Sequence, residues 1–354
     1  MSAESTGLAV RRPVKKSRDR RHRRPPQLVT YTALDPDVRA PRQGWRIVAA
    51  KEFADYLSSV RFVVLALILG LAAALAVYTA SAEIRDAARQ VSGHPSLFLA
   101  LFTIGAENVP AFAFLISFLG PLLGIAFGFD GINGERTEGT LPRLLSQPIH
   151  RDDVINGKFV GALSAIGLLL AAITLVVAAL GIVQLGVIPQ PDSILRLLMW
   201  LVVAVIYVGF WLAFALLCSV VLRRAATSAL VAIALWLVLT LFSTLLIGLI
   251  AGAFAPLTAD PTPAQALANE SLQVQLGWLS PSRLFEDATS ALLNPSVRTV
   301  GLVLPIQADR AITSILGFDQ SLLVVWPQIV ALVALTVVSF AVAYVAFMRQ
   351  EVRA

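Results

Sequence analysis

Residues 134–158, GERTEGTLPRLLSQPIHRDDVINGK, form a short charged segment between two long apolar runs. The whole chain has 354 residues, of which 57% are hydrophobic and only 14% charged, and its mean hydropathy is +0.77. Soluble domains carry about 25% charged residues. The composition therefore predicts an all-α integral membrane protein, with this charged segment as a loop between two of its spans.

Six apolar runs are each long enough to cross the roughly 30 Å hydrocarbon core of a bilayer as a helix. They lie near residues 62–82, 110–129, 159–185, 197–222, 226–254 and 322–348. The third and fifth runs exceed the length that one crossing needs, which allows a tilt, a kink or a broken helix. None of the six runs contains Asp, Glu, Lys, Arg or His.

The distribution of basic residues predicts the orientation of these spans, because cytoplasmic loops and tails are enriched in Lys and Arg. Residues 1–43 are densely basic, and we interpret them as a disordered cytoplasmic arm that touches anionic lipid. Basic residues recur after the second, fourth and sixth spans, at Arg136, Arg143, Arg151, Lys158, Arg223, Arg224, Arg349 and Arg353. Both termini are therefore predicted to lie in the cytoplasm.

The segments that face the other side are 81–109, 186–196 and 255–321, and their basic residues are sparser. The long segment 255–321 contains several prolines, and two or three short outer helices are expected there. One of them covers LSPSRLFEDATSALLNP (279–295), with Pro281 or Ser282 near its start and Asn294 at its end. No second soluble domain is predicted, so residues 44–354 form one transmembrane domain.

A helix is also predicted just before the first span, in GWRIVAAKEFADYLSSVRF (44–62). Its apolar residues, among them Trp45, Val48, Phe53 and Tyr56, recur at helical spacing, and Glu52 is assigned to another face. Such a pattern is typical of a helix that lies in the inner interface of a membrane. The alternative is a simple extension of the first span.

Within the charged loop, Thr140 is suited to cap a short helix whose apolar stripe is Leu141, Leu144 and Leu145. This helix ends near Gln147, and Asp152 or Asp153 caps the next one. An isolated helix this short rarely persists in water, so it must pack against something. A stripe ringed by Glu135, Arg136, Glu138 and Arg143 suits the groove of a partner protein. The alternative is a solvated loop whose charges only orient the spans.

The stretch FGFDGINGERTEGTLPRLLSQPIHRDDVINGKF (127–159) closely resembles the segment of ABC-2 type permeases in which the second span leads into a cytoplasmic coupling helix. The shared features are Glu, Gly-Thr-Leu, Leu-Leu-Ser, Pro-Ile, a basic residue and Gly-Lys. LSPSRLF (279–285) also fits the subgroup that contains the membrane subunit of the nitrous-oxide-reductase maturation transporter. Two features depart from the wider family, namely the basic arm and the long segment 255–321.

The resemblance implies a six-span permease in the cytoplasmic membrane of a prokaryote, paired with a second, identical or related, permease subunit. It places Glu135, Glu138, Gly139, Thr140 and Leu141 at or beside a coupling helix that contacts a separate ATPase. It makes residues 45–56 the connecting helix. ATP and Mg²⁺ are then bound by the partner, and this chain carries no cofactor.

The sequence itself contains no phosphate-binding loop that would contradict this division of labour. Gly157 and Lys158 are followed by Phe159 rather than by Ser or Thr, so the chain is not expected to hydrolyse ATP. The one cysteine, Cys218, and the three histidines lie in separate segments, which predicts no metal site. No nucleic-acid-binding motif accompanies the basic arm, so nucleic acid is not an expected partner.

Other classes of membrane protein fit the sequence less well. Ion-coupled transporters usually bury ionisable residues near the midplane of the membrane, and the six predicted spans have none. An intramembrane hydrolase needs a nucleophile beside a base or a metal. A passive channel or anchor remains an alternative, as does a role in the maturation of an extracytoplasmic protein. Apolar spans favour a lipidic or amphiphilic substrate carried outward, and no substrate-contacting residue is predicted.

Overall fold

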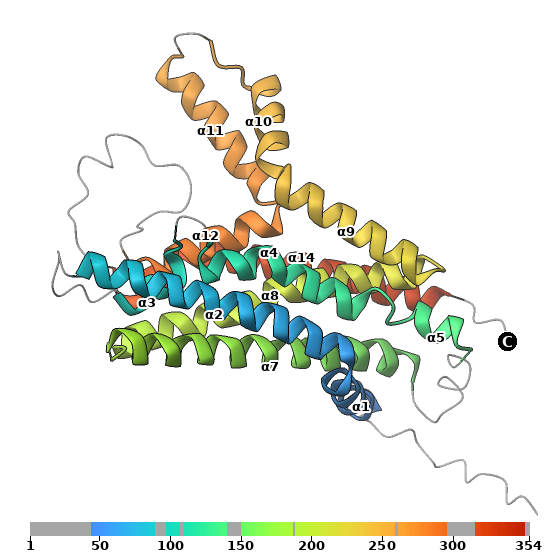
Figure 1. The fold of residues 1–354 in the computed structure, drawn as a ribbon. Helices are drawn as coiled ribbons and strands as arrows, with labels where there is room; N and C mark the ends of the chain where they lie inside the picture. Colours follow the sequence, from blue (N-terminus) through green and yellow to red (C-terminus); the bar gives the residue numbers. More distant parts are fainter. Residues whose placement is uncertain are drawn as a thin grey trace, which may run out of the picture. The chain divides into compact units, whose positions relative to one another are not determined.

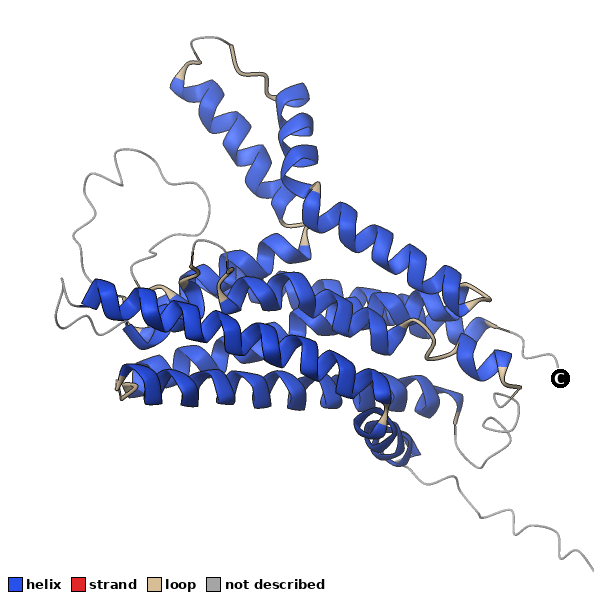
Figure 2. Cartoon of the chain, in the orientation of Figure 1, coloured by secondary structure: helices blue, strands red, loops and turns tan. Residues whose placement is uncertain are grey.

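A computed structural model describes residues 44–88, 97–106, 109–139, 150–186, 188–258, 261–295 and 316–350. The chain divides into two units, residues 1–39 and 40–354, and every described residue belongs to the second unit. Within the described ranges all regular structure is helical, apart from a single bridge between Ala106 and Val109 (Figure 2). The all-α prediction is therefore confirmed for this part of the chain.

Five long helices have the length and composition of membrane spans among the described residues: α2 (Val60–Ala88), α4 (Phe112–Gly128), α7 (Arg151–Leu185), α8 (Pro191–Val221) and α14 (Phe318–Arg349). They coincide with the first, second, third, fourth and sixth predicted spans. A sixth span is formed if α9 (Ala225–Leu241) and α10 (Ser243–Phe254) are taken together, although they are bent by 62° at Phe242. The chain is therefore a multi-pass membrane protein, and its fifth predicted span is a broken helix.

Two helices begin before the apolar spans predicted within them, because each predicted span stopped at a charged residue. Helix α7 begins at Arg151, ahead of the span predicted from residue 159 and close to the helix start expected at Asp152 or Asp153, and it carries Asp153 and Lys158 in its first turns. Helix α8 begins at Pro191 rather than at residue 197, and it includes Asp192 and Arg196. Charged residues therefore lie inside these two helices close to their ends, as Arg61 and Arg85 do in α2 and Asp319 and Arg349 do in α14, although none of the predicted spans contained them.

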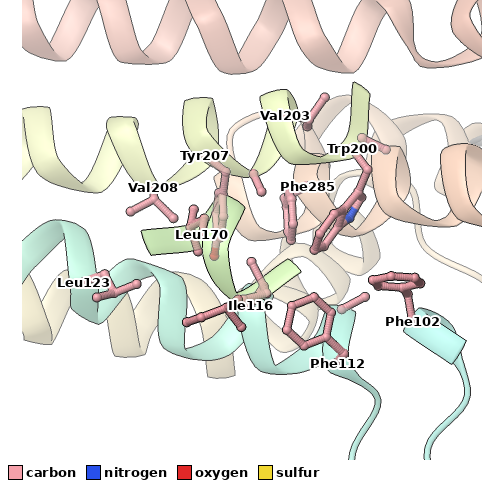
Figure 3. Packing of buried hydrophobic residues seen from close by; sticks show 14 of the residues in the cluster. Phe102, Phe112, Ile116, Leu123, Leu170, Trp200, Val203, Tyr207, Val208 and Phe285 are labelled. Carbon is pink, nitrogen blue, oxygen red and sulfur yellow. The ribbon is translucent and has the colours of Figure 1, made fainter. Parts of the chain in front are cut away.

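Helix α8 occupies the centre of the packing, since it contacts α4, α7, α9, α12 (Pro281–Leu293) and α14. Trp200, Tyr207 and Trp211 lie on it and are fully buried. Figure 3 shows aromatic side chains from three other helices gathered around the first two of them, including Phe102 of α3 (Leu97–Thr103), Phe112 of α4 and Phe285 of α12. The core is therefore built around α8.

The elements can be assigned to two ends of the bundle (Figure 1). Helices α1 (Gly44–Ser58) and α5 (Asn133–Thr137) and the last turn of α14 lie at one end, which we call the α5 end. Helices α3 and α12 lie at the other, which we call the α12 end. The picture shows α1 almost end-on, whereas α2 and α7 run across the view, so the chain turns sharply between α1 and α2.

The predicted short helices of segment 255–321 are present where this segment is described. Helix α11 (Pro263–Gly277) packs along α10, and its capping box joins Thr262 and Gln265. Helix α12 starts at Pro281 and ends before Asn294, as its turn and cap residues had predicted, and Ser280 supplies its N-terminal cap. Residues 296–315 lie outside the described part.

A buried arginine ties three elements together at the α12 end. Arg196 of α8 is fully buried, and its guanidinium donates to the carboxylate of Asp192 at 2.6 Å and to the hydroxyl of Ser321 at 2.8 Å. It also donates to the carbonyl oxygens of Leu292 in α12, at 3.3 Å, and of Leu316, at 2.6 Å. Because several donors find acceptors, this charge can stay out of water.

Candidate functional site

A buried lysine joins three helices at the α5 end. The ammonium of Lys158, on α7, donates to Glu52 Oε1 of α1 at 2.9 Å and to Glu135 Oε1 of α5 at 3.1 Å. Only 5% of the Lys158 side chain is exposed. A buried ammonium is costly unless carboxylates compensate it, and here two of them do. We call these three residues the Lys158 cluster.

Two glycines of α7 bring α1 close enough for this cluster to form. A Cβ atom on Gly157 would lie 2.5 Å from the Cβ of Val48, and one on Gly161 would lie 2.8 Å from the carbonyl oxygen of Ala49. Val48, Ala49 and Glu52 are the side chains that α1 buries along its length, with Gly44 at its start. The backbones of α1 and α7 can therefore approach closely only because no side chain separates them.

Asp153 fixes the starts of both α1 and α7. Its Oδ1 accepts the backbone N–H of Trp45 at 2.9 Å, and its Oδ2 accepts the backbone N–H of His150 at 3.1 Å. A carboxylate is well placed at a helix N-terminus, where N–H groups lack partners within the helix. The N-cap residue itself is His150 rather than the predicted Asp152 or Asp153. Asp153 stands at the third position of α7, completes a capping box with His150, and in addition serves α1.

A second set of contacts attaches the corner between α1 and α2 to the end of α4. Arg61 forms an ion pair with Asp130 at 2.6 Å, and the Tyr56 hydroxyl donates to the carbonyl oxygen of Phe127 at 3.0 Å. The rings of Tyr56 and Phe127 meet edge to face with centroids 4.9 Å apart. Since half of the Arg61 side chain is exposed, its ion pair contributes at most about 1 kcal/mol, and the aromatic contact is the firmer one.

Helix α5 is held by the ends of α8 and α14. The Ser219 hydroxyl of α8 accepts the backbone N–H groups of Ile132 and Asn133 at 2.9 and 3.1 Å, which supplies partners for the first turn of α5. Arg136 donates to the carbonyl oxygen of Val220 at 3.3 Å and to the side chain of Gln350. Helix α5 is therefore bonded to α7, to α8 and to Gln350 just after α14.

The Lys158 cluster forms part of the wall of a cavity of about 230 Å³. Carboxylates predominate in its lining, which comprises Glu52, Asp55, Tyr56, Ser59, Arg61, Asp130, Gly131, Gly134, Glu135, Glu138 and Lys158. Burial, together with the nearby carboxylates of Glu52 and Asp130, raises the pKa of the Tyr56 hydroxyl above its ordinary value. No group of three or more His, Cys, Asp or Glu side chains suited to a metal ion occurs within the described ranges.

The predicted coupling residues separate into those that the structure describes and those that it does not. Glu135 joins the Lys158 cluster and Glu138 lines the cavity, whereas Arg136 turns away towards α8 and α14. Gly139 ends α5 in the left-handed region, with φ of 70°. Thr140, Leu141, Arg143, Leu144 and Leu145, with the rest of the predicted coupling helix, lie outside the described residues.

The predicted connecting helix exists as α1, with one correction to its faces. Val48 is buried against α7, and Trp45, Phe53 and Tyr56 are partly buried. Glu52, assigned from the sequence to a separate polar face, lies buried on the same side as Val48 because it follows it by one helical turn. The four-residue spacing between Val48 and Glu52 is the sequence feature that indicates their shared face. The sequence shows Lys158 only as one of the basic residues that orient the spans, and it gives no signal for the contacts of Arg61, Asp130 and Ser219.

Comparisons with known proteins agree with the sequence resemblance. The family described as ABC-2 family transporter protein matches residues 46–352. A probable ABC transporter permease protein, NosY of Stutzerimonas stutzeri, is 28% identical over 214 residues, which are 58% of this chain and 73% of that protein. The protein of the same name from Pseudomonas aeruginosa is 36% identical over 99 residues, which are 27% of this chain and 34% of that protein.

Proposed function

This chain belongs to the ABC-2 transporter family and is a membrane subunit of an ABC transporter, and from that premise we propose how it couples to its ATPase. ATP-driven closure of a separate ATPase moves the segment that follows α5. The Lys158 cluster passes this movement to α1 and α7, and the spans then switch a pathway between inner and outer access. The substrate is carried outward across the cytoplasmic membrane.

The contact of Lys158 with Glu52 and Glu135 carries this proposal. Separating a buried ion pair leaves each partner as an uncompensated charge, which costs free energy. Moving the three helices together therefore costs less free energy than moving one of them away from the others. Helix α5 directly precedes the segment that resembles the family's coupling helix. The cluster is therefore well placed to transmit force from a partner on that side of the membrane.

The proposed orientation puts the α5 end in the cytoplasm and the α12 end outside. Arg136, Arg151, Lys158, Arg223, Arg224 and Arg349 all belong to the end turns and loops of the α5 end. Among the described residues, the corresponding elements of the α12 end carry fewer basic residues, namely Arg85, Arg196 and Arg283. This asymmetry favours the α5 end as cytoplasmic, with both termini on the same side.

The proposed assembly contains two permease subunits and two ATPase subunits. ATP and Mg²⁺ are bound by the ATPase, and the present chain contributes the pathway and the docking surface. The second permease copy is identical or related. Lipid covers the remaining apolar faces, and nucleic acid is not a partner.

A second candidate function is the maturation of an extracytoplasmic protein. It is favoured by the resemblance of LSPSRLF (279–285) and of residues 127–159 to the nitrous-oxide-reductase maturation permease, and the similarity to two proteins named NosY supports it as well. In that case α11 and α12 would act on a protein outside the membrane, and the same coupling to an ATPase would drive the change.

Purification of the tagged chain in mild detergent, followed by intact mass spectrometry of the complex, tests the proposed assembly. Two ATPase copies per two permease copies are expected. Glu138→Arg, which reverses a charge on the cavity wall, should remove the ATPase, whereas Glu270→Arg on the exposed side of α11 should retain it. Recovery of the chain alone, under conditions in which a known ABC transporter stays assembled, would contradict the proposal.

A further inference from the structure

A second cavity, of about 260 Å³, lies at the α12 end between α3, α4 and α12. Its lining includes Thr103, Phe114, Ser117, Glu286, Thr289 and Ser290. Pockets for drug-sized ligands occupy roughly 300–1,000 Å³, so this cavity suits a small headgroup rather than a whole lipid or peptide. It is separate from the Lys158 cluster and takes no part in the coupling described above.

The polar lining of this cavity accepts hydrogen bonds and carries one negative charge. The Ser117 hydroxyl donates to Glu286 Oε1 at 3.2 Å. The Thr289 hydroxyl accepts the indole N–H of Trp200 at 3.0 Å. Within the described part of the chain no Lys, Arg or His lines the cavity, and Glu286 forms no ion pair there, although Arg283, one turn earlier on α12, attracts its charge from outside the cavity. A ligand that brings a positive charge and N–H donors would complement this wall.

The helices that carry Ser117 and Glu286 are joined by buried side chains next to the cavity. The Tyr207 hydroxyl donates to the carbonyl oxygen of Ser117 at 2.8 Å and lies 3.2 Å from the Ser282 hydroxyl. Tyr207 of α8 therefore connects α4 to α12. Tyr207 stacks on Phe285 with ring centroids 4.5 Å apart, and Figure 3 shows these two side chains beside Trp200. Ser117 and Glu286 are therefore positioned before any ligand arrives.

An aromatic ring completes the arrangement. Phe114 lines the cavity, is 53% exposed, and stacks on Phe118 with ring centroids 6.2 Å apart. The face of such a ring attracts a cation within about 6 Å. A carboxylate, several hydroxyls and an aromatic face are thus present around one small cavity.

We propose that this cavity binds a primary ammonium group, with Glu286 as its counter-ion, the hydroxyls as further acceptors and the Phe114 ring beside it. Three N–H donors on an ammonium can each find an acceptor in this lining. A quaternary ammonium has no N–H donor and gains only the charge attraction. The ammonium can belong to a soluble alkylamine or to the headgroup of phosphatidylethanolamine.

Equilibrium dialysis of radiolabelled n-butylamine against the full-length protein in phosphatidylcholine nanodiscs tests this site. Saturable binding of one amine per chain is expected, and Glu286→Gln should weaken it by at least about tenfold, because the charged hydrogen bond is lost. Asp287→Asn is the matched control, since Asp287 neighbours Glu286 on α12 but does not line the cavity. The affinity of the Asp287→Asn variant for n-butylamine should stay within about twofold of that of the wild type.

Three results would overturn the proposal: uptake without saturation, equal affinity in Glu286→Gln, or equally tight binding of tetramethylammonium. Thermal unfolding of each variant shows whether the fold is retained. Nanodiscs that contain phosphatidylethanolamine then distinguish the two sources. Loss of butylamine binding in them assigns the site to the lipid headgroup, and unchanged binding assigns it to a soluble amine.

Discussion

Lys158 and Glu52 are separated by 106 positions in the sequence, yet the ammonium of one lies 2.9 Å from the carboxylate of the other, and both side chains are buried. Glu135 completes the contact from a third helix. Replacing one member therefore leaves charge behind, whereas replacing all of them does not. This difference separates the electrostatic role of the cluster from its packing role.

Lys158→Met leaves the buried carboxylate of Glu52 with only the exposed Lys51 as its cation and removes the cation of the partly buried Glu135. It should destabilise the protein by about 3 kcal/mol. The midpoint of thermal unfolding in detergent measures the loss. A triple variant that adds Glu52→Gln and Glu135→Gln should recover most of it, because no buried charge remains. If the triple variant is no more stable than Lys158→Met, the loss comes from packing and the electrostatic account is wrong.

Gly157→Ala places a Cβ atom 2.5 Å from the Cβ of Val48, and it should force α1 away from α7 at a cost of about 1–3 kcal/mol. Thermal unfolding again gives the magnitude, and Val48→Gly on the same background should restore part of the stability. Gly248→Ala is the control, since no atom lies within 4 Å of the added carbon there. Equal effects at the two glycines would show that the close approach is unimportant.

Arg196→Met removes a buried guanidinium that bonds to α8, α12 and the start of α14, so the damage should concentrate at the α12 end. Hydrogen exchange should accelerate by at least about tenfold in residues 281–293 and 316–325, with little change in α1. Arg223→Met, at the exposed turn after α8, provides the comparison. Uniform acceleration through the whole molecule would argue against a local clamp.

The burial of Glu286 should make the stability of the protein depend on pH in a defined direction. Burial raises its pKa above the ordinary value of 4.5, although the Ser117 hydroxyl and Arg283 oppose this shift, and Asp287 and Tyr207 are the other titratable groups close to it. A carboxyl whose folded pKa is raised contributes stability that is complete below the unfolded pKa and is lost as pH rises through the folded pKa. Glu286→Gln should therefore flatten the decline in unfolding midpoint above about pH 4.5. A steeper decline in the variant would reverse the assigned sign.

The sequence predicted the spans well because burial in lipid requires long apolar runs, and such runs are visible without any structure. The break at Phe242 was anticipated only as one option for an overlong fifth span, since no Pro or Gly stands at that position. Pro281 marked the start of α12 correctly, and Asp152 and Asp153 placed the start of α7 to within about two residues, because capping depends on neighbouring residues. Local chemistry was therefore readable from the sequence.

Contacts between helices that are far apart in the sequence could not be predicted from it. Lys158 and Arg196 each stand next to a predicted span, where a charge ordinarily marks the start of a loop. Their burial depends on carboxylates and carbonyl groups brought together by the fold. Glu52 gave a partial signal through its spacing from Val48, but its partner could not be identified from one sequence.

The most direct test of the coupling account is the rate of ATP hydrolysis by the assembled complex in proteoliposomes, divided by the rate of its ATPase alone. The triple variant with Lys158→Met, Glu52→Gln and Glu135→Gln should still fold and assemble. Its ratio should be at least about tenfold lower than that of the wild type, because charge no longer holds α1, α5 and α7 together. Glu270→Gln, which removes an exposed charge from α11, should keep the wild-type ratio. A wild-type ratio in the folded, assembled triple variant would contradict the claim that this cluster transmits ATPase motion to the membrane.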